Sequence, residues 1–87
     1  MKHYVYILES VEVGRWYIGA SDDPQRRLRE HNAGKHRSTK GYAPYRLIHT
    51  EEFSTKKEAL QREKFIKISG RIRKELKDKH SAPSSIG

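Results

Sequence analysis

The distribution of apolar and polar positions along the chain predicts three β-strands. His3–Leu8 and Arg15–Ala20 are short runs dominated by Tyr, Val, Ile and Trp, and a third run lies within Tyr45–Phe53. β-Branched and aromatic residues of this kind fit the pleated, half-buried surface of a sheet. The three runs therefore indicate one small sheet.

The first two strands are close enough in the chain to form a hairpin across Ser10–Gly14. A loop centred between Val11 and Glu12 would place Tyr6 directly opposite Tyr17, with their Cβ atoms ~4.5–5.5 Å apart. Val11 and Glu12 are poor residues for a tight two-residue turn, so a bulge or a longer loop stays open. The register matters because a slip of one residue would send Tyr17 to the other face.

A first helix is predicted over Pro24–Asn32. An Asp immediately precedes Pro24, and this pair is typical of a helix start, with Asp as the N-cap and Pro at the first helical position. Gly34 is placed to end the helix. Arg27 and His31 are four residues apart, so they share one face of it.

Two further helices are predicted after the third strand. Thr55 and Glu58 have the spacing of a capping box, which starts a helix at Lys56 and carries it to about Ser69. Gly70 interrupts that helix. A third helix is expected from Arg71 to about Lys79.

These elements make one α+β domain with a mainly antiparallel three-stranded sheet. Its predicted bounds are residues 1–79, and residues 80–87 are expected to form a flexible C-terminal tail. A chain of 87 residues has room for only one small core.

Composition narrows the partners and the compartment. The formal net charge of +8 suits a polyanionic partner, although a basic domain without a special partner has the same composition. The absence of cysteine excludes disulfides and thiolate metal sites. The five histidines are scattered without zinc-ligand spacing. No apolar stretch approaches ~20 residues and no signal-peptide pattern is present, so we expect no membrane association and a cytoplasmic protein.

Glu63 is the strongest candidate for chemistry in the second half of the chain. On a helical wheel it falls on the same face as Ala59, Leu60 and Ile66. A carboxylate in an apolar stripe is costly unless it is paired or binds a cation. A salt bridge with one of the arginines is one interpretation. The other is a divalent ion, because Mg²⁺ typically takes one or two protein carboxylates and bridges to phosphate.

The two tyrosine segments complete a pattern that resembles a known family. Tyr4-Val5-Tyr6 and Tyr17-Ile18-Gly19 are followed by Arg27, His31 and Glu63. This order is similar to that of the GIY-YIG nucleases over roughly residues 3–78. Within the family the chain looks most like the small, stand-alone bacterial proteins. It also resembles the N-terminal nuclease domain of the incising subunit of bacterial nucleotide excision repair, a DNA repair enzyme.

The resemblance implies a role for each matching residue. Tyr17 would position or deprotonate the attacking water, and Tyr6 would hydrogen-bond at the same centre. Gly19 would permit close approach of substrate or backbone. Arg27 would stabilise charge on the phosphate, and His31 would orient water or contact phosphate. Without the resemblance, the tyrosines read as cross-strand packing, Gly19 as a strand-end glycine, and the other two as solvated side chains of a helix.

The resemblance also implies a metal and a substrate grip. Glu63 would hold one divalent ion, Mg²⁺ or Mn²⁺. The loop of residues 33–44 has four basic or histidine side chains and no acid, and Lys35, Arg37 and Lys40 would grip the substrate backbone. Otherwise this loop would only aid solubility.

The expected function is metal-dependent hydrolysis of phosphodiester bonds in nucleic acid, by an endonuclease that acts on DNA and selects for structure rather than sequence. The alternatives are a non-catalytic nucleic-acid-binding module on the same scaffold and a domain that docks onto an acidic partner protein. Two differences from the family pattern bear on catalytic strength: no Asn follows Asn32, and Ala20 stands where the excision-repair relatives have Lys.

Overall fold

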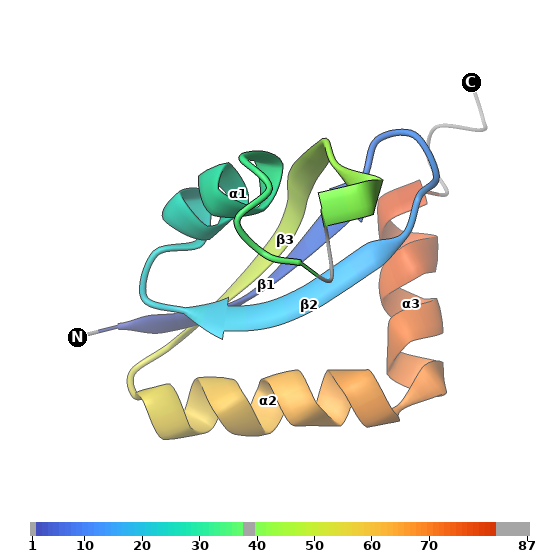
Figure 1. The fold of residues 1–87 in the computed structure, drawn as a ribbon. Helices are drawn as coiled ribbons and strands as arrows, with labels where there is room; N and C mark the ends of the chain where they lie inside the picture. Colours follow the sequence, from blue (N-terminus) through green and yellow to red (C-terminus); the bar gives the residue numbers. More distant parts are fainter. Residues whose placement is uncertain (1, 38–39, 82–87) are drawn as a thin grey trace.

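A computed structural model describes residues 2–37 and 40–81 of the chain, and it contains one three-stranded antiparallel sheet (Figure 1). The strands are ordered β2-β1-β3, with β1 (His3–Ser10) in the centre between β2 (Trp16–Ser21) and β3 (Tyr45–Phe53). The predicted α+β class and mainly antiparallel sheet are confirmed.

Helices cover both faces of the sheet (Figure 1). One face, which we call the α1 face, is covered by α1 (Pro24–Asn32). The opposite face, the α2–α3 face, packs against α2 (Lys56–Ile68) and α3 (Gly70–Ser81). A short 3₁₀ turn at Lys40–Tyr42 lies in the connection between α1 and β3. No helix in the described part of the chain is long and apolar enough to cross a membrane.

Alternation along β1 divides the core between the two faces. Val5 and Ile7 point into the α2–α3 face, where they pack with side chains of both helices. Tyr6 and Leu8 point into the α1 face, where Leu28 of α1 packs against them. All four strand residues are buried, so the central strand organises both halves of the core. The predicted site residues of the hairpin therefore belong to the smaller, aromatic half.

The hairpin register differs from the tight-loop expectation by two residues. Tyr6 lies opposite Gly19 rather than Tyr17, and Tyr17 lies opposite Leu8. The loop is longer because Ser10 pairs with Arg15, which leaves residues 11–14 to make the turn, with Gly14 at a φ of 73°. The direct opposition of the tyrosines was wrong, but a shift of two keeps both on one face.

The ends of α1 follow the predicted local chemistry. Asp23 is the N-cap and its carboxylate accepts a hydrogen bond from the Arg26 backbone N–H at 3.1 Å. At the other end, Gly34 has a φ of 76°, and its N–H donates to the His31 carbonyl while the Lys35 N–H donates to the Glu30 carbonyl. This pair of bonds is the Schellman arrangement that a glycine permits.

The break between α2 and α3 lies at Ser69 rather than at Gly70. The capping box of Thr55 and Glu58 is present at the start of α2 as predicted. Ser69 has an extended backbone, and its hydroxyl accepts a hydrogen bond from the Ile72 N–H at 3.3 Å, so it caps α3 and Gly70 is the first residue of that helix. α3 continues to Ser81, beyond the predicted end at about Lys79; of the expected tail, residues 82–87 lie outside the described residues.

Asn32 ties the end of α1 to the start of β3. Its side-chain amide donates to the Tyr45 carbonyl at 3.0 Å, and its side-chain oxygen accepts from the Tyr45 N–H at 2.6 Å. The side chain thus substitutes for a neighbouring strand at that point of β3. This pair of bonds holds the end of α1 against β3. Because α1 carries Arg27 and His31, the bonds also help to position these two residues relative to the sheet.

We expect Asn32→Ala to lower the free energy of unfolding by about 1–2 kcal/mol, because two hydrogen bonds are lost and the Tyr45 backbone groups lose their partner. Urea denaturation measures this change. Gln25→Ala, at an exposed position of the same helix, is the control and should change stability by less than about 0.5 kcal/mol. Equal effects of the two substitutions would mean that Asn32 does not anchor the helix.

Candidate active site

Tyr6 is the centre of the candidate site. It lies in the middle of the central strand, and only 1% of its surface is exposed. Its ring crosses the backbone of β2 at Gly19, and the ring centroid lies 6.3 Å from that of Tyr17. The two predicted tyrosines are therefore neighbours on the α1 face, in a diagonal rather than a directly opposed arrangement.

Gly19 is required by this crossing. A Cβ atom at position 19 would lie 2.6 Å from the Tyr6 hydroxyl oxygen and 2.7 Å from its Cζ. Such distances are well inside van der Waals contact, and the Tyr6 ring is buried and cannot swing away. The predicted close approach at Gly19 thus exists within the protein, between the β2 backbone and Tyr6.

Arg27 joins α1 to Tyr6. Its Nε donates a hydrogen bond to the Tyr6 hydroxyl at 3.5 Å, and its Nη1 donates to Glu30 Oε1 at 3.0 Å. Burial raises the pKa of Tyr6, which outweighs the opposing effect of Arg27, so the Tyr6 phenol keeps its proton at neutral pH. The Tyr6 hydroxyl therefore accepts from Arg27 and retains its own proton for donation.

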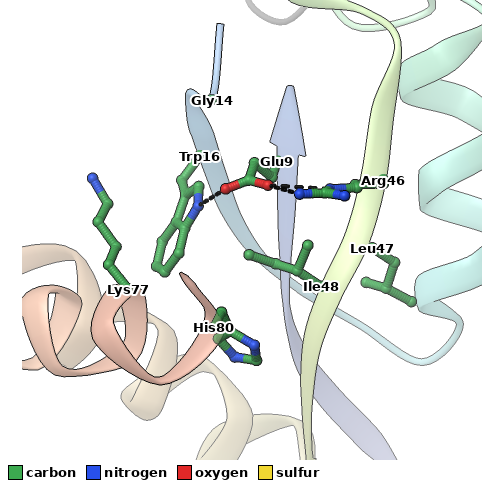
Figure 2. Close-up of a pocket in the computed structure, with 8 residues that line it drawn as sticks. All are labelled: Glu9, Gly14, Trp16, Arg46, Leu47, Ile48, Lys77 and His80. Carbon is green, nitrogen blue, oxygen red and sulfur yellow. Dashed lines mark hydrogen bonds and ion pairs between the residues drawn. The ribbon is translucent and has the colours of Figure 1, made fainter. Parts of the chain in front are cut away.

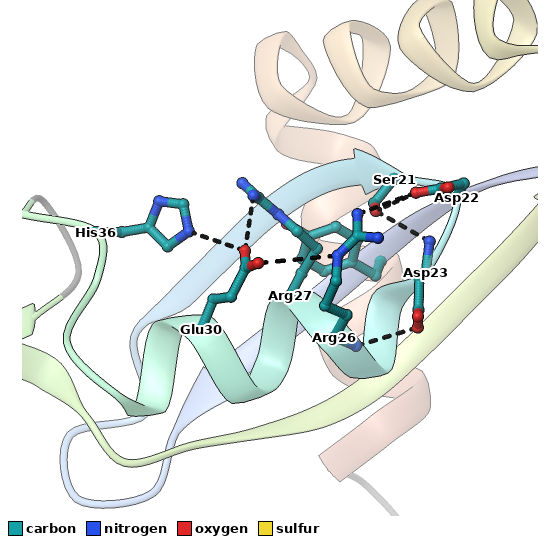
Figure 3. A network of polar contacts seen from close by, with 8 residues as sticks. Ser21, Asp22, Asp23, Arg26, Arg27, Glu30 and His36 are labelled. Atoms are coloured by element: carbon teal, nitrogen blue, oxygen red, sulfur yellow. Dashed lines mark hydrogen bonds and ion pairs between the residues drawn. The ribbon is translucent and has the colours of Figure 1, made fainter.

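Glu30 is a site residue that the sequence interpretation missed. Figure 3 shows Arg26, Arg27 and His36 converging on its carboxylate, at 3.8, 3.0 and 3.6 Å. Desolvation favours protonation of Glu30, but His36, Arg27 and Arg26 together hold its pKa below the ordinary value. The signal was present in the sequence, since Glu30 follows Arg26 and Arg27 at the helical spacings of four and three.

His31 is fully buried, not a surface residue of the helix. Its ring centroid lies 4.5 Å from that of Tyr17, 4.2 Å from that of His36 in a stacked pair, and 6.1 Å from that of Tyr45. Burial is the main reason why the pKa of His31 falls to about 4, and the nearby His36 and Arg27 lower it further. A neutral His31 therefore supports the Tyr17 ring from beneath, and direct contact with phosphate would require it to leave this position.

Glu63 approaches the site from α2. Its side chain is 17% exposed, and Oε2 accepts from Lys67 Nζ, one helical turn on, at 2.6 Å. The salt bridge of the simpler interpretation therefore forms with a lysine of the same helix rather than with an arginine. The Glu63 charge also contributes to the raised pKa of Tyr6, which follows from its proximity to the tyrosine.

The donor set around Glu63 suits a hydrated ion. Among residues 2–37 and 40–81, no three His, Cys, Asp or Glu side chains gather into a metal-binding group. A caged zinc or calcium site would need such a group. One partly buried carboxylate instead fits the habit of Mg²⁺ and Mn²⁺, which keep several waters and take their remaining ligands from a substrate phosphate.

The basic residues of the α1–β3 connection are exposed. Lys35, Arg37 and Lys40 all lie at the surface, and the same segment carries His36, which stacks on buried His31. The connection therefore passes over the His31–Tyr17 stack. The three basic residues predicted to bind the substrate backbone therefore lie on the α1 face. They are not among the residues that contact Tyr6 or Arg27 in the hydrogen bonds described above.

Two cavities lie near the hairpin. A cavity of about 290 Å³ is lined by Trp16, Tyr17, Ile18, Lys67 and Arg73, so it borders the candidate site at the outer edge of β2. A larger one of about 680 Å³, shown in Figure 2, lies at the end of the α2–α3 face and contains none of the predicted site residues. The candidate chemistry is thus at the edge of the sheet rather than in the larger of these two cavities.

The family follows from comparison of the whole chain with known proteins. The family model described as the GIY-YIG catalytic domain matches residues 2–77. The chain belongs to the GIY-YIG family. The predicted resemblance is confirmed, and the site described above occupies the matched region.

Individual relatives of this GIY-YIG chain are small UPF0213 proteins. One from Halobacterium salinarum is 46% identical over 74 residues, which are 84% of this chain and 95% of that protein. The Bacillus subtilis protein YazA is 40% identical over 75 residues, covering 85% and 75% of the two chains. A solution NMR structure of the UPF0213 protein BH0048 from Bacillus halodurans has a TM-score of 0.58 and 40% identity, and the match covers 97% of this chain and 90% of that one.

This chain matches most of the length of these small relatives, and the relatives come from more than one domain of life. Bacterial proteins are among them, but an archaeal one is as well, so the resemblance does not indicate a bacterial source. The solved structure confirms the fold of the GIY-YIG domain.

We expect Gly19→Ala to cost about 1–3 kcal/mol of stability, because the new methyl group overlaps the buried Tyr6 ring. In a Tyr6→Leu background, which lacks the overlapping atoms, the same substitution should cost clearly less. Denaturant unfolding of the four proteins of this cycle measures the coupling. Gly41→Ala is the control, because a Cβ there would meet nothing within 4 Å. Additive effects at positions 6 and 19 would contradict the crossing.

We expect stability to fall by about 2 kcal/mol between pH 7 and pH 5, because unfolded His31 takes up a proton near pH ~6.5 whereas the buried ring resists it down to about 4. Burial also lowers the pKa of His80, which acts in the same direction. His31→Gln should remove most of the pH dependence, and His80→Gln should remove less. The free energy of unfolding at several pH values tests this, and an unchanged slope in His31→Gln would refute it.

Proposed function

We propose that this chain is a metal-dependent nuclease that hydrolyses phosphodiester bonds in nucleic acid, with DNA as its substrate. The observation that carries the proposal is the placement of the Arg27 guanidinium between the Tyr6 hydroxyl and Glu30, on the same face as Tyr17. Membership of the GIY-YIG family and a net charge of +8 both support a nucleic-acid substrate.

Arg27 is proposed to bind the scissile phosphate. A guanidinium has five N–H donors in a rigid fork, and the bonds to Tyr6 and Glu30 use Nε and Nη1. The remaining donors can approach two oxygens of a phosphate. Because the Arg27 side chain is 28% exposed, the charge developing on those oxygens meets a cation that is already oriented.

The two tyrosines are proposed to have different roles around the attacking water molecule. Tyr6 keeps its proton and orients Arg27, which is consistent with its burial. Tyr17 is less buried and lines the cavity at the edge of β2, which supports the proposal that its hydroxyl contacts the attacking water molecule. The His31 ring, whose centroid lies 4.5 Å from that of Tyr17, is proposed to support the Tyr17 ring in this position.

Glu63 is proposed to hold the divalent ion. Bound there, Mg²⁺ or Mn²⁺ would neutralise phosphate charge and lower the pKa of its water. The Glu63 carboxylate pairs with Lys67, a residue that lines the smaller cavity at the edge of β2. The exposed Lys35, Arg37 and Lys40 are proposed to contact the substrate backbone beyond the site.

We expect cleavage of labelled DNA that requires Mg²⁺ or Mn²⁺ and stops with EDTA. Arg27→Ala should reduce the rate by about 100-fold or more, since it removes a charge-stabilising donor. Glu63→Gln should abolish the metal-dependent cleavage, because it removes the carboxylate proposed to hold the ion. Duplex, single-stranded and branched substrates are compared, because the proposal predicts selection by shape rather than by base sequence.

Matched variants control for charge and helix position. Arg29→Ala removes an exposed arginine of the same helix, and Glu75→Gln removes an exposed carboxylate of α3. Both should keep activity within a few-fold of the parent protein. Salt-sensitive DNA binding without metal-dependent products, in all of these proteins, would instead establish a non-catalytic binding module. Unimpaired cleavage by Arg27→Ala would refute the assigned phosphate contact.

A further inference from the structure

We propose that Trp16 forms a stacking subsite for an unpaired nucleobase next to the scissile phosphate. The inference rests on the proposed nuclease function and adds a substrate class to it, namely a strand that is single-stranded beside the cut. Its support comes from the position of Trp16 on the edge strand, from the contacts that hold its ring, and from the cations around it.

Trp16 is the immediate neighbour of Tyr17 on β2. The two side chains point to opposite faces of the sheet, since alternate residues of a strand do so. Within residues 2–37 and 40–81, β2 is an edge strand with β1 as its one neighbour, so no further strand of this part of the chain covers its outer side. The cavity of about 290 Å³ at that edge is lined by both side chains. A nucleic-acid strand that passes around the edge at Tyr17 therefore meets Trp16 next.

The indole of Trp16 is fixed by a row of polar contacts across all three strands. Its Nε1 donates to Glu9 Oε2 at 3.1 Å, and Arg46 donates to Glu9 Oε1 from Nε at 3.1 Å and from Nη2 at 2.6 Å (Figure 2). Glu9 is the register partner of both residues. The same contacts neutralise the Glu9 carboxylate, so a phosphate nearby does not meet an uncompensated anion.

Trp16 also lines the larger cavity, beyond the edge. That cavity of about 680 Å³ is open to solvent and within the size range of small-molecule sites. Lys77 and His80 of α3 and Arg46 of β3 lie around it, and Figure 2 shows the indole between Lys77 and Glu9. The Lys77 ammonium lies over the indole ring, 5.3 Å from its centroid, so a base that stacks on this face displaces the Lys77 side chain toward the phosphates of the bound strand. An aromatic ring bordered by cations is the combination by which proteins bind unpaired bases.

Basic residues also lie between Trp16 and the candidate active site, and we call this row of basic residues, together with Lys77, the cationic track. Lys67 and Arg73 line the smaller cavity together with Tyr17, and Lys67 is the partner of Glu63. Arg73 is held in place because its Nη1 donates to the backbone carbonyls of Ile66 and Lys67 at the end of α2. Along the edge of β2, the candidate phosphate site is therefore followed by the cavity with Lys67 and Arg73, and then by the indole of Trp16. Only an unpaired base can present its face to that ring, since bases within a duplex are already stacked on their neighbours.

Fluorescence of the parent protein tests the stacking directly, because Trp16 is the only tryptophan in the chain. The protein is titrated in EDTA, which prevents cleavage, with an eight-nucleotide thymidine strand and with an abasic strand of the same length and charge. We expect quenching by the thymidine strand and little by the abasic one. Equal responses to the two strands would overturn the stacking proposal, because they would report phosphate binding alone.

Substitutions at Trp16 separate stacking from packing, since part of the indole contacts the core. Trp16→Phe keeps an aromatic face, whereas Trp16→Leu keeps apolar bulk only. Fluorescence anisotropy of a dye-labelled thymidine strand should show binding about 5-fold or more weaker for Trp16→Leu than for Trp16→Phe. Thermal unfolding of both variants identifies any loss of folding. Equal affinities of two folded variants would overturn the proposal.

A lysine pair tests the cationic track. Lys77→Gln should weaken binding of the thymidine strand more than Lys56→Gln, which removes the same charge at the far end of α2 from α3 (Figure 1). Equal losses would mean that only net charge matters and would count against the subsite.

Failure of the subsite and failure of the nuclease are distinguishable. Metal-dependent cleavage lost in Arg27→Ala but equal in Trp16→Leu and Trp16→Phe would uphold the nuclease and reject the subsite. Base-dependent quenching without cleavage by the parent protein would uphold stacking on a non-catalytic module and reject the hydrolysis. Both proposals together predict preferential cleavage of a duplex with a single-stranded flap over a blunt duplex, and Trp16→Leu should lose that preference.

Discussion

The crossing of Tyr6 over Gly19 fixes the candidate site, because it sets the distance between the central strand, the edge strand and the first helix. Tyr6 starts from the most buried strand of the sheet and ends at the Arg27 side chain. The Tyr6 ring can lie across β2 and reach Arg27 only because position 19 lacks a Cβ. A methyl group at that position would occupy the space of the ring. Arg27 is then held at one end by Tyr6, while Asn32 fixes its helix to β3 at the other. The three elements of the site are thereby held together by contacts between residues that are distant in the chain.

Features that depend on a few adjacent residues could be predicted from the sequence. The start of α1 at Asp23 and Pro24 and the capping box of Thr55 and Glu58 follow from rules that act within one turn of helix. The break before α3 was placed one residue late for an instructive reason. Glycine is a common helix breaker, which is why the break was predicted at Gly70. The residue whose hydroxyl caps the next helix must itself have an extended backbone, and that residue is Ser69.

Features that depend on pairing between distant residues could not be predicted in the same way. Simple alternation would place Leu47 and His49 on one face of β3, but a shift of register opposite Ile7 and Leu8 separates them. The burial of His31 had the same origin. Its helical spacing from Arg27 showed only that the two share a face, while its exclusion from solvent depends on Tyr17 and Tyr45, on separate strands, and on His36 in the connection that folds back over it. The order of the site residues along the chain was predictable from the family resemblance, but which of them are exposed was not.

The exposure of the Arg27–Glu30 pair bears on how a phosphate could enter the site. Arg27 and Glu30 are 28% and 27% exposed, and ion pairs of such exposure contribute little net stability because water competes for both partners. Replacement of the Glu30 carboxylate by a phosphate oxygen therefore costs little. The bond from Arg27 Nε to the buried Tyr6 hydroxyl is shielded from water, so it persists through that exchange and keeps the guanidinium in position. Arg26 and His36 remain as partners for Glu30 after the exchange, so the displaced carboxylate is not left without a cation. Under the proposed function, a phosphate would therefore replace the contact with Glu30 while the contact with Tyr6 holds the orientation of Arg27.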